Sequence, residues 1–542
     1  MRGARPALRG AALSAVVYAL AAVIFSFPAV LAGPERIVGR NFDALGTVWV
    51  LQAAPRLLAG GVDPLTGWPA GAPLGRLDSW TLLPAGALFS WMDPARLHGA
   101  LAIVGLAVSA FAAERAAVGL GARSPWSLIA GFCFAFSGLS ATALLEGHSY
   151  LLLDPWLPLL GWAWWRCSRP EARPAHGLAA GLGFAGALFT SGYLGVVGAL
   201  YVVVVGAAAL WRGQLSARGA LAALAVALPT ALLYLVLAEG GPGSAAPGEW
   251  VDDVDRLAAG SAGSLQWGPP TAGIDLRDHS ASVFLPFTAL SLVGVAPRVL
   301  GRLPGWRALV AAGLLFALLS LGPLWWLGPL GAFTAPTAAL AELPGVGAVR
   351  FPARLAWGSA LCFGLVAARV ATALAEGGTW RAAPLGIALL VDVFVVGGMP
   401  ARLGQFPGGA PSLYAGRGAV LDLAPESLGD LDEVAALSTS LGCAFQASHG
   451  RPLPGFCPYR RDDRRFGEQR ALLSALEGSP AGLLEALRAR QISTVVLWAD
   501  LFEAPDRRRL EDALLIVDPN PVASRSHGLY LRAYQVPPAV QP

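Results

Sequence analysis

"GRNFDALGTVWVLQAAPRLLAGGVDP", residues 39–64, is a helical pattern too polar to cross a membrane, and it follows the first long apolar run of the chain. Apolar residues recur at roughly helical spacing from Phe42 to Leu58, which is typical of an amphipathic helix that lies on a membrane surface. Asp43 falls in the first turn of this helix. Taken alone, an acid in that position is explained by the helix dipole, which favours it by under about 1 kcal/mol.

The composition of the whole chain is that of a polytopic membrane protein. Of its 542 residues, 55% are hydrophobic and only 14% are charged, and the mean hydropathy is +0.56. Average soluble domains carry about 25% charged residues, so a soluble protein of this size would lack polar surface. The net charge of +4 argues against a nucleic-acid partner. No zinc or iron–sulfur spacing and no Walker A, GxGxxG, HExxH or GxSxG motif stands out.

Apolar runs long enough to span a bilayer divide the first 399 residues of the chain. They lie near residues 11–32, 97–120, 125–145, 148–166, 177–190, 192–211, 217–238, 282–299, 305–325, 350–375 and 381–398. Because a transmembrane helix needs about 20 residues, residues 1–399 are expected to form an α-helical bundle of about eleven spans, the first of them an uncleaved helix. A shorter apolar piece, 81–92, is expected to be a half-helix that leads into the second span.

The arginines predict the orientation of these spans, because positive residues stay on the cytoplasmic side. With the N-terminus in the cytoplasm, each cytoplasmic loop carries arginine: Arg115 and Arg123, then Arg166, Arg169 and Arg173, then Arg212 and Arg218, then Arg298, Arg302 and Arg307, then Arg381. The outer side then receives the loops 33–96 and 239–281 and the tail 400–542. The tail is predicted to be a small soluble α/β domain, in which Cys443 and Cys457 permit either a disulfide or two free thiols.

Ionisable groups near a membrane face are costly and are usually functional or paired. On the predicted outer side the candidates are Asp43, Asp78, Glu146, His148, Asp275, Asp278, His279, Arg350 and Arg354. Glu146 and His148 fall in a tight turn between two spans, where they are either an acid–base pair or simply the polarity that such a turn requires. Arg350 and Arg354 are four residues apart, so they share a helical face that could bind a phosphate or extend to the membrane interface.

Two further acidic features have no single interpretation. Asp154 lies inside the predicted span 148–166, where a buried carboxylate needs a partner, and the following Pro155 marks a position at which the helix could break. The loop 239–281 carries clustered acids that suit either a divalent cation or a solvated acidic loop.

Several strings in a fixed order resemble the GT-C class of membrane glycosyltransferases, and most closely a bacterial branch with a soluble extracytoplasmic C-terminal domain. They include the first loop with Asp43 and "GGVDPLTGWPAGAPLG" (60–75), the turn Gly147–His148, and "LPGVGAVRFPAR" (343–354). In the tail they are "AVLDLAPE" (419–426) and "SHGRPLPGF" (448–456).

The resemblance implies transfer of a sugar from a polyprenyl-phosphate donor at the outer face of the bacterial cytoplasmic membrane. Asp43 would deprotonate the acceptor hydroxyl, Arg350 or Arg354 would hold the phosphate leaving group, and Glu146 or His148 would assist. Asp78 is the alternative to Glu146 as a second acid at the substrate. The implied partners are the donor, membrane lipid and an acceptor glycan, lipid or protein, and Mg²⁺ or Mn²⁺ is the cofactor to consider.

Two other functions fit the same composition. A transporter or flippase of a lipid-linked glycan usually has internal repeats and midplane polar groups, whereas the two halves of this chain show no convincing repeat and its ionisable groups gather at the outer rim, Asp154 excepted. A non-catalytic membrane scaffold that presents the outer tail is the third possibility.

Overall fold

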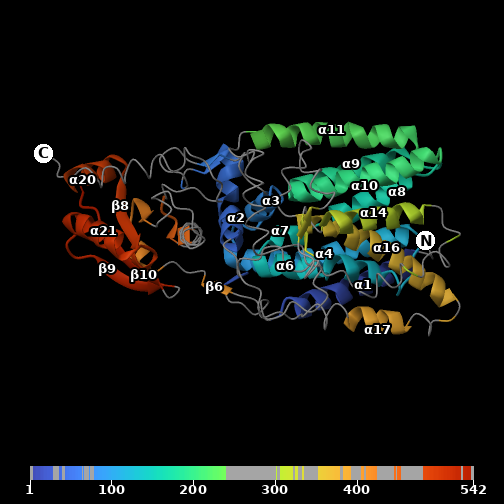
Figure 1. Ribbon diagram of the computed structural model, residues 1–542, viewed down its shortest axis with the longest axis horizontal. Coiled ribbons are helices and arrows are strands. Elements are labelled where there is room, and N and C mark those ends of the chain that lie inside the picture. Colours follow the sequence, from blue (N-terminus) through green and yellow to red (C-terminus); the bar gives the residue numbers. More distant parts are fainter. Residues whose placement is uncertain are drawn as a thin grey trace.

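The computed structural model describes most of the predicted membrane helices and much of the tail. The described residues are 4–27, 36–39, 43–63, 65, 72–73, 79–239, 294, 301, 305–320, 324–326, 332–334, 352–376, 378, 383–391, 405–407, 411–423, 445–446, 449–452, 480–526 and 529–538. Figure 1 shows an elongated molecule with a helical bundle at one end, the C-terminal strands and helices at the other, and α2 (Asp43–Gly60) between them.

Long apolar helices form the bundle, as the hydropathy pattern predicts. They are α1 (Ala4–Phe25), α4 (Pro94–Gly119), α9 (Pro174–Thr190), α10 (Gly192–Trp211), α11 (Ala217–Glu239), α14 (Trp306–Ser320), α16 (Ala356–Glu376) and α17 (Ala383–Val391). Within the described part of the chain, four helices are long and apolar enough to cross a membrane: Pro94–Gly119, Gly192–Trp211, Ala217–Val236 and Ala356–Glu376. The protein is therefore a multi-pass membrane protein, and the total of about eleven spans stays a prediction.

Two predicted spans are interrupted helices. The run 125–145 forms α5 (Leu128–Ala135) and α6 (Gly138–Glu146), and the run 148–166 forms α7 (Ser149–Leu152) and α8 (Trp156–Cys167). Asp154 explains the second break, because its Oδ1 accepts hydrogen bonds from the backbone N–H groups of Trp156 and Leu157 at 3.2 and 3.1 Å. The buried carboxylate thus finds its partners at the start of α8.

The C-terminal strands form a four-stranded mixed sheet in the order β7–β8–β10–β9. The strands are β7 (Ala419–Leu423), β8 (Ile492–Trp498), β9 (Val522–Ser526) and β10 (Leu529–Gln535), and only the β7–β8 pair is parallel. With α20 (Pro480–Ala489) and α21 (Ala504–Val517) these strands make the C-terminal α/β unit. A small mixed α/β structure is what the tail sequence predicts.

The remaining described elements are short strand pairs and 3-10 helices. The pairs are β1 (Arg36–Val38) with β6 (Gln405–Pro407), β2 (Val62–Asp63) with β3 (Ala72–Pro73), and β4 (Leu324–Trp326) with β5 (Ala332–Thr334). The 3-10 helices are η4 (Pro352–Leu355), η7 (Ser412–Tyr414) and η9 (Ala499–Leu501). The half-helix expected at 81–92 is α3 (Leu82–Leu88), directly before α4.

The amphipathic helix α2 is covered by protein. Its residues Leu45, Val48 and Trp49 are buried in one apolar cluster with α3 and with Val496 and Trp498 of the C-terminal unit. The indole N–H of Trp49 also donates to Gln446 Oε1 at 2.9 Å. Helical periodicity identified the apolar residues of α2, but α3 and the C-terminal unit cover these residues in place of the membrane surface that the sequence predicted.

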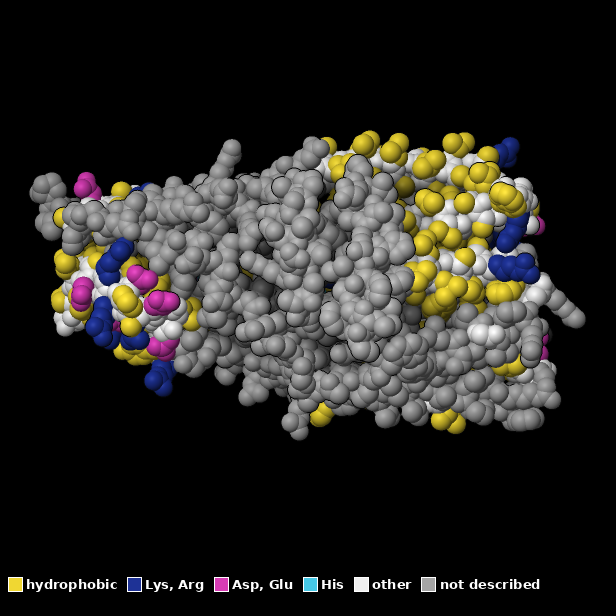
Figure 2. Space-filling view, in the orientation of Figure 1, with side chains coloured by type: hydrophobic (Ala, Val, Ile, Leu, Met, Phe, Trp, Pro, Cys, Tyr) yellow, Lys and Arg dark blue, Asp and Glu magenta, His cyan; other side chains and the backbone are white. Residues whose placement is uncertain are grey.

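The loops between the helices divide into two ends of the bundle. At the end far from the C-terminal unit, Arg369 donates to the carbonyl of Gly121 at 2.9 Å and Ser216 N–H donates to the carbonyl of Cys167 at 3.1 Å. Figure 2 shows Lys and Arg side chains gathered at that end, beyond a hydrophobic surface that covers the helices. The presence of basic side chains at this end agrees with the arginine pattern of the sequence. The side of the membrane that each end faces stays a prediction.

Candidate functional site

The turn between α6 and α7 is built around a left-handed glycine. Gly147 has φ +81°, a backbone conformation that glycine adopts without steric cost. The His148 N–H donates to the carbonyl of Ala143 at 2.8 Å, which closes the end of α6. The chain therefore reverses sharply, and the buried His148 ring, 3% exposed, turns back so that its Nδ1 lies 3.0 Å from Glu146 Oε2.

Arg354 reaches the same turn from a distant part of the sequence. It belongs to η4, directly before α16, and its Nη2 lies 3.4 Å from His148 Nε2. Its guanidinium carbon lies 4.8 Å from the ring centre of Tyr193, near the start of α10, at cation–π distance. A guanidinium only donates hydrogen bonds, so the contact assigns Nε2 of His148 as an acceptor and places the ring proton on Nδ1, toward Glu146.

The start of α2 packs directly on this turn. A methyl group added at Gly147 would collide with Ala44, and one added at Gly39 would lie 2.9 Å from both Ala44 Cβ and Gly147 Cα. The backbone of Asp43 immediately precedes Ala44, so it lies at the same junction, whereas its side chain is outside the described residues. Three parts of the chain that are far apart in the sequence therefore meet at one place: Gly39 with Ala44, residues 146–148, and Arg354.

Other predicted site residues lie outside the described residues, namely Asp78, Arg350, Asp275, Asp278 and His279, and with them the acidic loop from residue 240 to 281 and both Cys443 and Cys457. Among the side chains that the structure does describe, no group of three or more His, Cys, Asp or Glu could hold a metal ion. Glu146 and His148 alone supply two ligand types, fewer than a protein-held ion usually has. A Mg²⁺ or Mn²⁺ ion therefore stays a prediction.

Sequence reasoning missed three side chains that contact this junction, namely His98, Ser149 and Tyr193. His98 in α4 is buried, with its Nε2 2.9 Å from the Val38 carbonyl and its Nδ1 3.0 Å from Ser149 Oγ. Tyr193 packs against Arg354 as described. A histidine inside the predicted span 97–120 is itself a signal, because ionisable residues in spans are costly.

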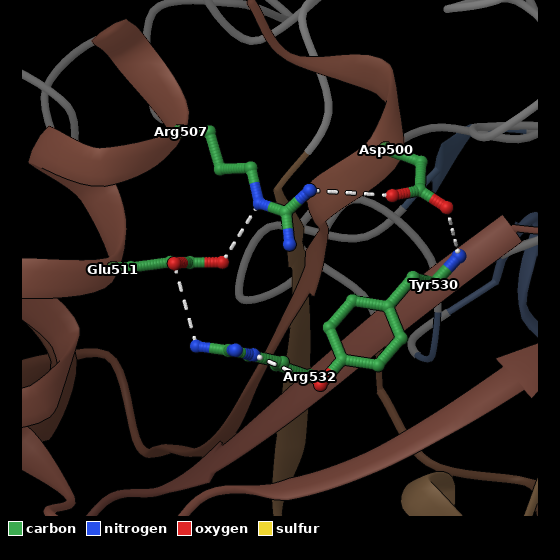
Figure 3. Close-up of polar contacts among 5 residues, drawn as sticks. All are labelled: Asp500, Arg507, Glu511, Tyr530 and Arg532. Atoms are coloured by element: carbon green, nitrogen blue, oxygen red, sulfur yellow. Dashed lines mark hydrogen bonds and ion pairs between the residues drawn. The ribbon is translucent and has the colours of Figure 1, made fainter. Parts of the chain in front are cut away.

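A second group of charged residues, in the C-terminal unit, has a different character. Figure 3 shows Arg507 between Asp500 and Glu511, at 3.3 and 3.0 Å, and Arg532 at 3.4 Å from the other oxygen of Glu511. Asp500 also accepts the backbone N–H of Tyr530 at 2.8 Å. These charges neutralise one another and join α21 to β10, so they are assigned to the stability of the unit rather than to a substrate.

Comparison with known proteins places this geometry in a fold class. The chain matches no protein-family model and no curated protein. It is similar in structure to the arabinofuranosyltransferase AftD from Mycobacteria, with a TM-score of 0.51 and 18% identity over 97% of this chain and 40% of that chain. It is also similar to the apo oligosaccharyltransferase of Archaeoglobus fulgidus, with a TM-score of 0.50 and 12% identity over 91% of this chain and 69% of that chain.

At these identities the comparison concerns the fold. Over most of its length the chain shares the architecture of the GT-C membrane glycosyltransferases, which confirms the resemblance of its motifs at the level of the fold. The chain spans only 40% of the length of the arabinofuranosyltransferase.

Proposed function

We propose that this protein is a membrane glycosyltransferase that moves a sugar from a polyprenyl-phosphate donor to an acceptor hydroxyl at the outer face of the membrane. The observation that carries the proposal is the meeting of Arg354 with the Glu146–His148 pair where α2 begins. A fixed cation and a carboxylate-oriented imidazole there suit a phosphate headgroup, and the surrounding fold is that of glycosyltransferases.

The reaction is an inverting displacement at the anomeric carbon of the donor sugar. The acceptor oxygen forms a bond to this carbon, the bond from the carbon to the phosphate oxygen breaks, and the phosphate leaves on the lipid with the electron pair. The acceptor hydroxyl proton passes to a base, for which Asp43 is the candidate. Its backbone lies at the junction with Gly147, which supports this role.

Arg354 and His148 have complementary parts in the departure of the phosphate. Negative charge grows on the phosphate oxygens as the bond breaks, and positioned donors at that point lower the barrier. Arg354 supplies a permanent cation whose orientation is fixed by Tyr193. His148 keeps its Nδ1 proton beside the carboxylate of Glu146 and accepts from Arg354 on Nε2, so the pair orients the guanidinium for the phosphate. Arg350 and Asp78, predicted from the sequence alone, complete the proposed substrate contacts.

The remaining parts of the proposal come from the sequence pattern. Residues 1–399 are assigned to the membrane domain and 400–542 to an extracytoplasmic domain, with the N-terminus in the cytoplasm of a bacterial cell. The apolar surface of α11, with exposed Leu221, Leu224, Leu228 and Leu232, suits contact with lipid, the phase that holds a polyprenyl chain.

Binding of the lipid phosphate is the first test. Purified protein in nanodiscs is titrated with undecaprenyl phosphate and, separately, with undecaprenol. The phosphate is expected to bind more tightly, and Arg354→Ala is expected to weaken it by roughly 10- to 100-fold, the value of a charge-assisted hydrogen bond. Arg369→Ala is the matched control, since Arg369 lies in α16, the helix that directly follows η4, at the other end of the bundle. Equal binding of both lipids, or no effect of Arg354→Ala, would refute the phosphate site.

Transfer itself is tested in a strain that lacks the gene. Asp43→Asn is expected to reduce glycan transfer by about 10²- to 10⁴-fold, the contribution of a general base, while binding of undecaprenyl phosphate is retained. Asp63→Asn, in the same first loop, is the control. Transfer that survives in Asp43→Asn removes Asp43 as the base. Lipid-phosphate binding by a wild-type protein that cleaves no donor is the result expected of a flippase.

A further inference from the structure

A buried histidine connects the two sides of the junction. His98 is 1% exposed and lies near the start of α4, between β1 and the α6–α7 turn. Its Nε2 contacts the carbonyl of Val38 at 2.9 Å, and its Nδ1 contacts the hydroxyl of Ser149 at 3.0 Å. Val38 directly precedes Gly39, which packs against Gly147, and Ser149 directly follows His148.

The acceptor on each side determines where the protons lie. A carbonyl only accepts hydrogen bonds, so Nε2 of His98 carries a proton toward Val38. Burial disfavours a second ring proton, so Nδ1 accepts from the hydroxyl of Ser149. The chain of donors therefore runs from Ser149 through His98 to Val38, and it uses the single hydroxyl proton of a serine that is 1% exposed.

We propose that His98 and Ser149 are positioning residues that hold His148 and the start of α2 in register for the donor phosphate. The inference rests on the proposed function. Through Ser149, His98 fixes the residue next to His148, whose ring must face Glu146 and Arg354 at once. Through Val38, it fixes the strand that precedes Gly39 and Ala44, which pack on Gly147. One side chain thus sets the relative position of two walls of the site, without touching the substrate.

Two amide replacements separate the two contacts. The Gln amide reaches about as far as Nε2 of histidine, so His98→Gln can keep the bond to Val38 but loses the acceptor for Ser149. The shorter Asn amide lies near the position of Nδ1, so His98→Asn can keep Ser149 but loses Val38. Ser149→Ala removes the hydroxyl alone. His176→Gln is the control, because the ring nitrogen of His176 accepts from the Arg173 backbone in the α8–α9 loop.

The first measurement is the affinity of the full-length protein in nanodiscs for undecaprenyl phosphate. His98→Gln and Ser149→Ala are each expected to weaken binding by roughly 3- to 10-fold, as for one lost hydrogen bond. The double variant is expected to match His98→Gln alone, because both changes break the same bond. Additive losses, or wild-type affinity in both single variants, would overturn the inference.

The second measurement observes the network directly. In ¹⁵N-histidine NMR spectra of the same samples, His98 is expected to show one protonated and one unprotonated ring nitrogen, and Ser149→Ala should shift only the unprotonated one. His98→Gln should also shift the ring signals of His148, whereas His176→Gln should not. Unchanged His148 signals in His98→Gln would overturn the positioning role even if the protein were destabilised.

The two proposals fail in different ways. A wild-type protein that does not prefer undecaprenyl phosphate over undecaprenol refutes the proposed function, and the NMR signals then decide whether His98 positions His148. A wild-type protein that binds the phosphate through Arg354, with His98→Gln and Ser149→Ala indistinguishable from it, refutes only the role of His98.

Discussion

Two arginines, one in each part of the molecule, are held in opposite ways. Arg451 in the C-terminal unit is 4% exposed, and its guanidinium is surrounded by neutral acceptors. They are the carbonyls of Tyr414, Ala415, Arg417 and Gly418 and the hydroxyls of Ser493 and Thr494. Arg354 instead faces the imidazole of His148 and the ring of Tyr193, on elements that come from distant parts of the sequence.

The difference separates a structural arginine from a candidate ligand-binding one. The acceptors of Arg451 belong to the segment before β7 and to β8, so the guanidinium fastens the string "HGRP" to the sheet. Asp422, in the other tail string, accepts the Tyr414 hydroxyl at 2.6 Å and the Trp498 indole N–H at 3.2 Å. Both tail strings are therefore explained by folding, whereas the string that ends at Arg354 brings a cation to titratable side chains.

Arg451→Ala is expected to have the largest effect on stability. It leaves several buried carbonyls without their donor, and the expected loss is about 3–5 kcal/mol, which would unfold the C-terminal unit or release it to protease. Thermal unfolding and limited proteolysis of the full chain measure this loss. Arg417→Ala is the control, because the Arg417 side chain is exposed. Arg354→Ala is expected to change the free energy of unfolding by less than about 1 kcal/mol. Equal destabilisation by the two variants would contradict the distinction between the two arginines.

Gly147→Ala, compared with Gly61→Ala, tests how much the packing of α2 on the α6–α7 turn contributes to stability and to the site. Gly147 combines a left-handed backbone with direct contact to Ala44, whereas Gly61 has φ +69° and no described atom within 4 Å of an added methyl group. The left-handed conformation alone costs an alanine about 1–2 kcal/mol, so Gly61→Ala should lose about that amount. Gly147→Ala should lose more than about 2 kcal/mol and should also weaken binding of undecaprenyl phosphate, because α2 must move away from the turn. Equal melting temperatures for the two variants would contradict the packing of α2 on Gly147.

The sequence predicted the long helices well, because an apolar run of sufficient length has few alternatives to a span. The run 192–211 has the bounds of α10, and 97–120 differs from α4 by a few residues at its start. The sequence offered a helix break at Pro155 only as a possibility. Hydropathy is an average over many residues, so it does not show that the Asp154 carboxylate hydrogen-bonds to the backbone and interrupts the helix. Periodicity likewise identified the apolar face of α2 but could not identify the surface that covers it.

The candidate site was predictable in its parts rather than in its geometry. The sequence predicted Glu146, His148 and Arg354 from their place on the predicted outer side of the membrane and from the spacing of the residues. The structure brings these three side chains together. Asp78, Arg350 and the Asp43 side chain are outside the described residues and stay predictions. His98 was overlooked because its role depends on contacts with Val38 and Ser149, 60 and 51 residues away in the sequence, and no local pattern records such contacts.

Trp49→Phe is expected to have a smaller effect, confined to the boundary between the two parts. It keeps most of the buried ring but removes the donor to Gln446 Oε1, for an expected loss of about 1–2 kcal/mol. Hydrogen exchange at residues 445–452 should increase while the helices of the bundle are unchanged. Trp91→Phe is the control, because Trp91 is 76% exposed. Unaltered exchange at 445–452 would show that this hydrogen bond does not help to hold the C-terminal unit on α2.

Acid should have the smallest net effect on the C-terminal unit, because two groups near Arg451 oppose each other. Desolvation raises the pKa of Asp422 to about 6. The contribution of this group to the free energy of unfolding therefore increases as pH falls from about 6 toward 4. Desolvation and the nearby Arg451 lower the pKa of His449 to about 4. The contribution of this group to the free energy of unfolding therefore decreases as pH falls from about 6.5 toward 4.

Because the two contributions oppose each other, the free energy of unfolding of the wild type should change by less than about 1 kcal/mol between about pH 4 and 6.5. Asp422→Asn should therefore expose a loss of stability on acidification, and His449→Gln should expose a gain, both read from the melting temperature of the C-terminal unit at pH 4.5 and 7. Slopes of the same sign in the two variants would mean that groups other than this pair control the response.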